Sequence, residues 1–353
     1  MGFAKQPEFL AHNWTKMVNG VFIWLVFVRH FGILGGYSDR SFFMWERCYL
    51  GQLIVTTFLF FSGYGLMRSL AKSPQEYLTK LVKERFPRIW GTFAAMVMLY
   101  AGARSCMGAQ YSWSHIMMSL TGWESVGEPT WYIFMTLVEY LLIWVAFRSF
   151  GVGRSGAAVS MVGGLTLLLI YAISSYKEKC WYNTILCMPV GMLAALHKSE
   201  LQRCMQMVGR WVWIPVVVVV LLGAWVHKEA YGWCREMPLL RVWFGSLVAN
   251  AGAILFAGGM ALGVARATML QCDLQGGIIG RFLLWCGGSS LIYIFLLHNL
   301  PMHIGAYMEW NRNHEVLYFV FCVLFTLLSV FILDMKWFAY IKSKKYINSK
   351  TPE

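Results

Sequence analysis

Long apolar runs constrain the fold of this chain more than any other feature. Ten of them, each of about 16 to 25 residues, follow one another along the sequence. At about 1.5 Å per helical residue, such runs cross the ~30 Å hydrocarbon core of a bilayer. Because lipid offers no partner to backbone amides, each crossing must be helical. The predicted spans are 17–36, 48–70, 89–106, 129–149, 155–174, 182–197, 211–227, 240–264, 282–303 and 315–338.

The composition agrees with this membrane class. Only 13% of the residues are charged, whereas an ordinary soluble domain carries about 25%. The chain has no internal repeat and no appended soluble region, so residues 1–353 are predicted to form a single domain. The expected fold is therefore all-α, a polytopic transmembrane helical bundle of about ten spans.

Basic residues predict how the bundle is oriented. If the N-terminal segment 1–16 lies inside, 20 lysines and arginines fall on the inner side and nine on the outer side. This bias follows the positive-inside rule, so both termini, including the basic tail 339–353, are expected to be cytoplasmic. The net charge of +13 is then a topology signal and an attraction to anionic membrane lipids. It requires no nucleic acid partner.

The cysteines give no sign of a metal site. None of the nine belongs to a CxxC motif or is paired with histidine at ligand spacing, so no metal is predicted. Most lie in or beside apolar runs, where cysteine behaves as a small apolar residue. Cys106, Cys180 and Cys234 fall near the predicted outer face, where a disulfide among them could form.

A histidine inside the first span is the strongest chemical signal. His30 lies about 20 Å from the inner end of its span, and Asn19, Ile23 and Val26 share its helical face. One interpretation is a structural histidine bonded to a neighbouring helix. The other is a general base acting on an acceptor hydroxyl, since the unperturbed imidazole pKa of ~6.5 suits proton transfer. An ionisable group in the membrane favours the functional interpretation.

Two other charged residues are predicted near the depth of His30. Arg29 is expected to pair with Asp39, Glu46 or Glu139, or to extend toward the outer interface. Glu139 lies near the middle of its span, where an ionised carboxylate needs a partner. It is a candidate catalytic residue that orients His30, or a structural partner of an arginine.

His298 is the third candidate catalytic residue. Its span runs outward, so it too falls in the outer half of the membrane, where it could bind a sugar hydroxyl or share the role of base. The structural alternative is a helix-capping role near Pro301.

Further toward the inside, Ser62-Gly63-Tyr64-Gly65 ends the second span, and its small residues favour close helix packing.

A basic amphipathic strip follows this second span. Its cations are Arg68, Lys72, Lys80, Lys83, Arg85 and Arg88. One interpretation is a helix held at the interface by lipid headgroups. The other is a binding face for the phosphates of a cytosolic donor, since guanidinium groups pair with phosphate oxygens. The two are compatible.

Five motifs occur in an order that is typical of one family. They are the apolar run 20–27 leading to His30-Phe31, the run 58–66 with Ser62-Gly63-Tyr64-Gly65, Arg85-Phe86-Pro87-Arg88-Ile89-Trp90, Thr130-Trp131-Tyr132-Ile133-Phe134, and Ser290-Leu291-Ile292-Tyr293 through His298. On these motifs the chain resembles the acyltransferase-3 family of bacterial integral-membrane O-acyltransferases over residues 14–335. This family usually has Arg or Lys eleven residues before the histidine. Here Asn19 stands there, with Lys16 one turn earlier on the same face.

The resemblance implies a multi-pass O-acetyltransferase of the bacterial inner membrane. Its donor would be a cytosolic acyl-CoA, usually acetyl-CoA, and its acceptor a hydroxyl of a cell-surface or lipid-linked glycan. His30 takes the place of the family's catalytic histidine. The residues expected to contact the donor are Arg68, Arg85, Arg88, Lys16, Asn19, Ser62 and Tyr64.

A proton-coupled transporter of solutes or lipids is the alternative function. Ten spans, buried His and Glu residues and helix-breaking Gly and Pro residues fit such a carrier as well. The absence of an inverted repeat in the sequence and the six cations of the basic strip favour the transferase.

Overall fold

The computed structural model describes residues 9–235, 241–270 and 277–348, and all regular structure in these ranges is helical. The α-helices are α1 (His12–Leu34), α2 (Ser41–Tyr49), α3 (Leu53–Lys72), α4 (Pro74–Lys80), α5 (Phe86–Cys106), α6 (Trp113–Leu120), α7 (Trp131–Phe150), α8 (Ser155–Ile173), α9 (Cys187–Leu196), α10 (Lys198–Val208), α11 (Trp213–Trp233), α12 (Arg241–Met269), α13 (Ile278–Cys286), α14 (Leu291–Leu297), α15 (Asn299–Tyr307), α16 (Trp310–Asn313) and α17 (Glu315–Asn348). A π-helical turn, Leu81–Arg85, joins α4 to α5, and short 3₁₀ turns occur at Val152–Arg154, Lys179–Trp181 and Gly209–Val212. The ends of the predicted terminal segments, 1–8 and 349–353, and the first residue of the predicted span 240–264 lie outside the described residues.

The described helices form a multi-pass membrane protein. Seven of them are long and apolar enough to cross a bilayer, namely α1, α3, α7, α8 with its preceding turn, α11, α12 and α17. An eighth crossing can be made by α13 with α14 and α15, which meet at a bend of 70°. The all-helical membrane fold predicted from the sequence is therefore confirmed.

The predicted count of ten spans is confirmed only as far as these seven or eight. Two of the ten predicted spans, 89–106 and 182–197, are helical but fall outside the set of membrane-length apolar helices. α5 is long enough but less apolar, since Arg88 lies near its start and Arg104 near its end. α9 has ten residues and extends over about 15 Å, half the thickness of the hydrocarbon core.

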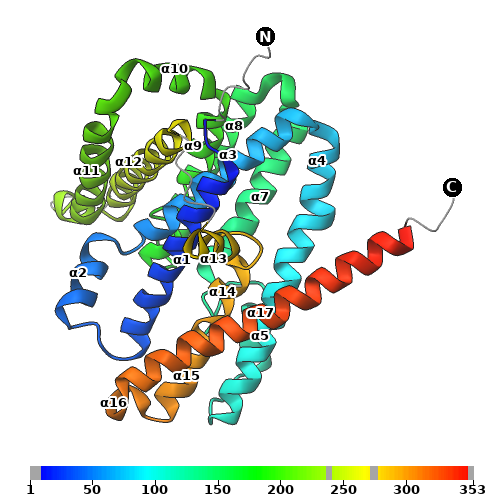
Figure 1. Cartoon of the computed structure of the whole chain (residues 1–353), viewed down its shortest axis with the longest axis vertical. Helices are drawn as coiled ribbons and strands as arrows, with labels where there is room; N and C mark the ends of the chain where they lie inside the picture. The colour runs from blue at the N-terminus through cyan, green and yellow to red at the C-terminus, as the bar shows by residue number, and fades with distance from the viewer. Residues whose placement is uncertain (1–8, 236–240, 271–276, 349–353) are drawn as a thin grey trace.

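The bundle is organised around α3. In α3, 78% of the apolar span is buried, compared with 22% in α11 and in α17. α11 lies at one edge and α17 crosses the front of the bundle (Figure 1). Both expose large apolar side chains, such as Leu221 and Trp225 on α11 and Leu328 and Phe331 on α17. Exposed apolar surface of this extent fits contact with lipid.

Glycines allow two close helix crossings. A Cβ on Gly63 of α3 would overlap the carbonyl oxygen of Met188 on α9, and a Cβ on Gly191 of α9 would overlap that of Phe60 on α3. At the second crossing, a Cβ on Gly20 of α1 would overlap the carbonyl oxygen of Leu283 on α13. Membrane helices commonly pack through small residues in this way. The predicted packing role of Gly63 is therefore confirmed, whereas Gly65 has no neighbouring atom at the corresponding position.

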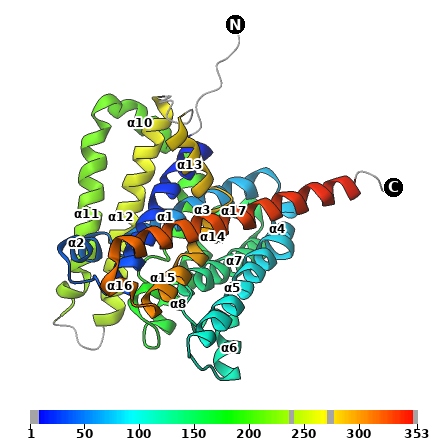
Figure 2. The same ribbon diagram turned by 60° about the horizontal axis from the view of Figure 1, so that its bottom comes forward.

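The connecting segments separate toward two ends of the bundle. α4 and α10 lie toward the end at which the chain begins, and α2 and α16 lie toward the opposite end (Figure 1). α6 lies at the end away from the N-terminus when the bundle is turned (Figure 2). Cys106, Cys180 and Cys234 are free thiols, so the disulfide considered from the sequence is not formed among them.

Candidate functional site

Two histidines that are far apart in the sequence meet between α1 and α14. His30 belongs to α1, and His298 directly follows α14. His30 Nδ1 lies 2.5 Å from His298 Nε2. The ring planes differ by 4° and the ring centroids are 4.8 Å apart, so the two imidazoles meet edge to edge. This geometry is that of one in-line hydrogen bond between the rings.

Hydrogen bonding determines which nitrogen of each neutral ring carries the proton. His298 Nδ1 lies 3.0 Å from the carbonyl oxygen of Ile294, which can only accept a hydrogen bond. His298 Nδ1 therefore carries the proton, and its Nε2 is the acceptor for His30 Nδ1–H. His30 Nε2 is then left with a free lone pair. The pair thus presents one basic nitrogen, oriented by the second histidine.

The two histidines differ in accessibility. His298 is fully buried, and the rings of Phe27 and Phe295 lie about 6 Å from its own, with centroid distances of 6.2 and 6.1 Å. His30 is only half-buried. Of the two histidines, only His30 has exposed surface, so His298 lies behind its partner.

A cavity of about 620 Å³ opens at the other end of α1. α1, α3, α5, α7 and the bend between α13 and α14 contribute to its walls. Its lining includes Lys16, Asn19, Ser62, Gly65, Arg85, Arg88, Gly287, Gly288, Ser289 and Ile292. Its size is in the range of small-molecule and cofactor sites, which is roughly 300 to 1,000 Å³.

This cavity brings together most of the residues predicted to contact a donor. Five of the seven line it, namely Lys16, Asn19, Ser62, Arg85 and Arg88. The other two, Tyr64 and Arg68, are not among its lining residues. Three cations on one concave surface make it suitable for an anionic ligand. Asn19 also contributes a buried side-chain oxygen that has no hydrogen-bond partner among the described residues.

Two helices connect the cavity to the histidine pair. On α1, Asn19 lines the cavity and His30 follows eleven residues later, about 16 Å along the helix. On α14, Ile292 lines the cavity and His298 follows it by about 9 Å. A ligand with a long arm, anchored in the cavity and lying along these helices, would extend toward His30.

Glu139 is not brought to the histidine pair. It is fully buried on α7, and its Oε1 accepts a 2.7 Å hydrogen bond from Thr166 of α8. None of the hydrogen bonds or ion pairs between described residues joins it to His30 or Arg29. Arg29 instead forms a 3.3 Å ion pair with Glu46 of α2, one of the three partners considered from the sequence. Burial raises the pKa of Glu46 above its usual value, although the nearby Arg29 acts in the opposite direction.

Asp334 on α17 is a buried carboxylate that was not predicted from the sequence. Its Oδ2 accepts hydrogen bonds from Trp285 Nε1 at 2.9 Å, Ser290 Oγ at 3.1 Å and Ser289 Oγ at 3.2 Å. Trp285 lies near the end of α13, and Ser289 and Ser290 lie in the bend between α13 and α14. Asp334 could have been found as a carboxylate inside a predicted span, where a charge requires partners.

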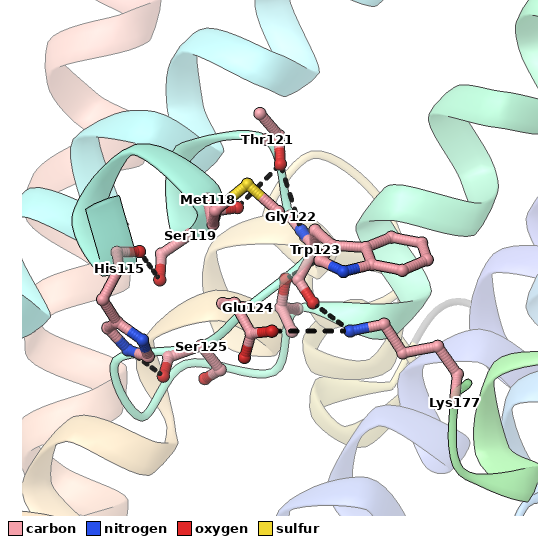
Figure 3. A network of polar contacts seen from close by, with 10 residues as sticks. His115, Met118, Ser119, Thr121, Gly122, Trp123, Glu124, Ser125 and Lys177 are labelled. Carbon is pink, nitrogen blue, oxygen red and sulfur yellow. Dashed lines mark hydrogen bonds and ion pairs between the residues drawn. The ribbon is translucent and has the colours of Figure 1, made fainter.

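A tightly bonded loop lies next to α15, directly beyond His298. Asn299 and His303 both bond the carbonyl oxygen of Gly127, at 3.2 and 3.1 Å. Lys177 donates a 2.5 Å hydrogen bond to the carbonyl oxygen of Trp123 and lies 3.9 Å from Glu124, as Figure 3 shows. Side chains from two distant parts of the chain, α15 and Lys177, therefore bond to this loop.

Glu128 is the buried carboxylate of this loop. Its Oε2 accepts a 3.0 Å hydrogen bond from the backbone of Val126, while its Oε1 has no partner among the described residues. Burial raises the pKa of Glu128 to about 7, against the opposing effects of its hydrogen bonds and of Arg104. This carboxyl group therefore changes its charge near neutral pH.

The described residues contain no group of three or more His, Cys, Asp or Glu side chains arranged to hold a metal ion. Comparison of the chain with protein-family models finds no match, and neither do comparisons with curated proteins and with solved structures. The histidine pair and the cationic cavity are therefore the features that indicate a function.

Proposed function

We propose that this chain is an integral-membrane O-acyltransferase of the acyltransferase-3 type. It would transfer an acyl group, in the simplest case acetyl, from cytosolic acyl-CoA to a hydroxyl of a cell-surface or lipid-linked glycan. The observation that carries the proposal is the placement of the two sites. A cationic cavity and a histidine with a free ring nitrogen lie at the two ends of the same helices, α1 and α14.

Each site has one part of the reaction. Lys16, Arg85 and Arg88 bind the phosphates of the donor, and the thioester end of the donor extends toward His30. His30 Nε2 takes the proton of the acceptor hydroxyl, and the hydroxyl oxygen attacks the thioester carbonyl. The C–S bond breaks, and the departing thiolate receives the proton from His30. The products are an acyl ester and free CoA.

His298 has a supporting role in this scheme. When His30 becomes positively charged, its Nδ1–H remains bonded to His298 Nε2, which stabilises the imidazolium ion. The buried hydrogen bond also fixes the His30 ring, so its Nε2 faces one direction throughout the reaction. This arrangement resembles the second hydrogen bond that orients the base in a catalytic triad.

The proposed topology has ten spans, counting α5 and α9, with both termini in the cytoplasm of a bacterial cell and the bundle in the inner membrane. The distribution of basic residues supports it, because 20 lie in the proposed inner segments and nine in the outer ones. The cationic cavity would then open toward the cytosol, which contains acyl-CoA. The histidine pair would lie in the outer half of the membrane, close to a glycan on the outer side.

The experiment that tests the proposal is the binding and turnover of acetyl-CoA by the purified chain in lipid nanodiscs. We expect saturable binding by calorimetry, followed by release of free thiol when membrane glycans are supplied. A well-folded protein that does not bind acetyl-CoA would contradict the acetyl donor. Acetyl-CoA binding without any thioester consumption would contradict the transferase and favour the transport alternative, with which the bent α13–α14 pair is also compatible.

A further inference from the structure

The bend between α13 and α14 forms one wall of the cavity and depends on a carboxylate from another helix. Gly287, Gly288 and Ser289 line the cavity at this bend. Gly287 must lack a side chain, because a Cβ there would overlap the carbonyl oxygen of Lys16 on α1. Asp334 of α17 lies behind the wall, 5% exposed, and does not itself line the cavity. The polarity of this wall is therefore set by a residue that the ligand does not touch.

The hydrogen bonds of Asp334 fix the hydroxyl protons at the bend. Trp285 Nε1 can only donate a hydrogen bond, and the same carboxylate oxygen also receives the hydroxyls of Ser289 and Ser290. An oxygen that accepts three hydrogen bonds carries no proton of its own. A serine hydroxyl has one proton, and that of Ser289 is used on Asp334. Only the lone pairs of Ser289 Oγ remain to face the cavity.

We propose that Asp334 is a positioning residue that makes this wall of the cavity a hydrogen-bond acceptor, with Ser289 as the contact to the ligand. The part of the ligand at Ser289 must then carry an N–H or O–H group. A phosphate diester, which offers only acceptors, cannot form a hydrogen bond with Ser289 Oγ. This inference rests on the proposed function, and it assigns the wall to the amide N–H groups of the pantetheine arm of acyl-CoA. The phosphates bind to the cations instead.

Two serines provide a matched test. Ser289 and Ser290 each give one hydrogen bond to the same oxygen of Asp334, but only Ser289 lines the cavity, and Ser290 is fully buried. We expect Ser289→Ala to raise the Kd of acetyl-CoA about three- to tenfold, the usual effect of one neutral hydrogen bond. Ser290→Ala should leave this Kd within about twofold of wild type, although it removes an equivalent hydrogen bond from Asp334.

A donor analogue tests the polarity of the contact. In this analogue of acetyl-CoA, each amide N–H of the pantetheine arm is replaced by an ester oxygen, which cannot donate. We expect the wild type to bind it about three- to tenfold more weakly than acetyl-CoA. In Ser289→Ala, acetyl-CoA and the analogue should bind almost equally. The substitution in the protein and the replacement in the ligand remove the same hydrogen bond, so their effects do not add. A purely structural effect of Ser289 would leave the analogue penalty unchanged.

Conservative substitutions of Asp334 complete the test. Asp334→Asn keeps an oxygen that can accept the three hydrogen bonds, and it should bind acetyl-CoA within about threefold of wild type. Asp334→Leu removes the acceptor and should raise the Kd at least as much as Ser289→Ala does.

Three outcomes overturn the inference alone: equal effects of Ser289→Ala and Ser290→Ala, an analogue penalty that persists in Ser289→Ala, and unchanged binding by Asp334→Leu. Failure of the folded wild type to bind acetyl-CoA would overturn the proposed function together with this inference.

Discussion

The histidine pair and the cationic cavity lie on the same two helices, yet they are built in different ways. The histidine pair is closed, with His298 fully buried and each hydrogen bond of its ring assigned to one partner. The cavity is open, with exposed arginines and space at Gly65. Chemistry at one nitrogen needs a fixed direction, whereas binding of several phosphate oxygens tolerates alternative contacts. Substitutions at the two ends should therefore separate kcat from donor affinity.

The largest effect is expected at His30. His30→Ala should lower acyl transfer about a thousandfold, since a positioned general base contributes about 10² to 10⁴. The affinity for acetyl-CoA should not change, because the histidine lies about 16 Å beyond Asn19 along α1. Transfer can be followed as labelled acetyl groups that pass from acetyl-CoA to the membrane glycan fraction. Normal transfer by a well-expressed His30→Ala protein would remove the catalytic assignment.

The second largest effect is expected in the cavity. The double substitution Arg85→Ala/Arg88→Ala should weaken acetyl-CoA binding about a hundredfold, through the loss of charge-assisted hydrogen bonds. Lys83→Ala is the matched control, because this exposed lysine belongs to the same basic strip but does not line the cavity. Calorimetry measures both. If Lys83→Ala weakened binding as much as the double substitution, the strip would act as a diffuse positive surface rather than as a site.

A smaller effect is expected behind the base. His298→Ala should lower kcat about ten- to thirtyfold, because His30 would lose the acceptor that fixes its ring, as metal sites lose function when an orienting partner is removed. The donor KM should remain unchanged. His298→Gln should recover most of the loss, since its side-chain oxygen can accept the hydrogen bond of His30 Nδ1–H. Failure of Gln to improve on Ala would argue that His298 has another role.

The smallest effect concerns the loop next to α15. Because the pKa of Glu128 is raised to about 7 in the folded protein, the folded state binds this proton more tightly than the unfolded chain does. Stability should therefore fall as the pH rises from about 4 to about 7. We expect Tm to fall by a few degrees less over this pH range in Glu128→Gln than in the wild type. Glu124→Gln, which changes an exposed carboxylate of the same loop, should have no such effect.

The sequence predicted the elements of the site better than their contacts. Helical spacing and span depth placed His30 and His298 at similar heights, but they could not show that the rings touch. That contact depends on the bend at Gly287 to Ser290, which follows from tertiary packing against Lys16 and from the hydrogen bonds of Asp334. Glu139 was predicted to lie near the depth of His30, yet its helix turns it toward Thr166, because periodicity does not specify which neighbour a face meets.

The span count shows a second limit of the sequence. An apolar run indicates that a segment prefers lipid or a protein core, but it does not distinguish between the two. Residues 182–197 are mostly buried against other helices, so in the proposed topology this crossing is surrounded by protein rather than by lipid. Only ten of these residues, Cys187 to Leu196, form α9, and this short helix packs closely against α3.

The shortness of α9 has a consequence for how the protein is made. A helix of about 15 Å cannot enter the bilayer as an independent span. Its first amides need partners, and the side chain of Asn250 on α12 accepts the N–H of Leu186 just before α9 begins. α3 is synthesised before α9 and α12 after it. The ribosome must therefore complete α12 before α9 can take its place, so insertion of this protein is expected to be cooperative rather than one helix at a time.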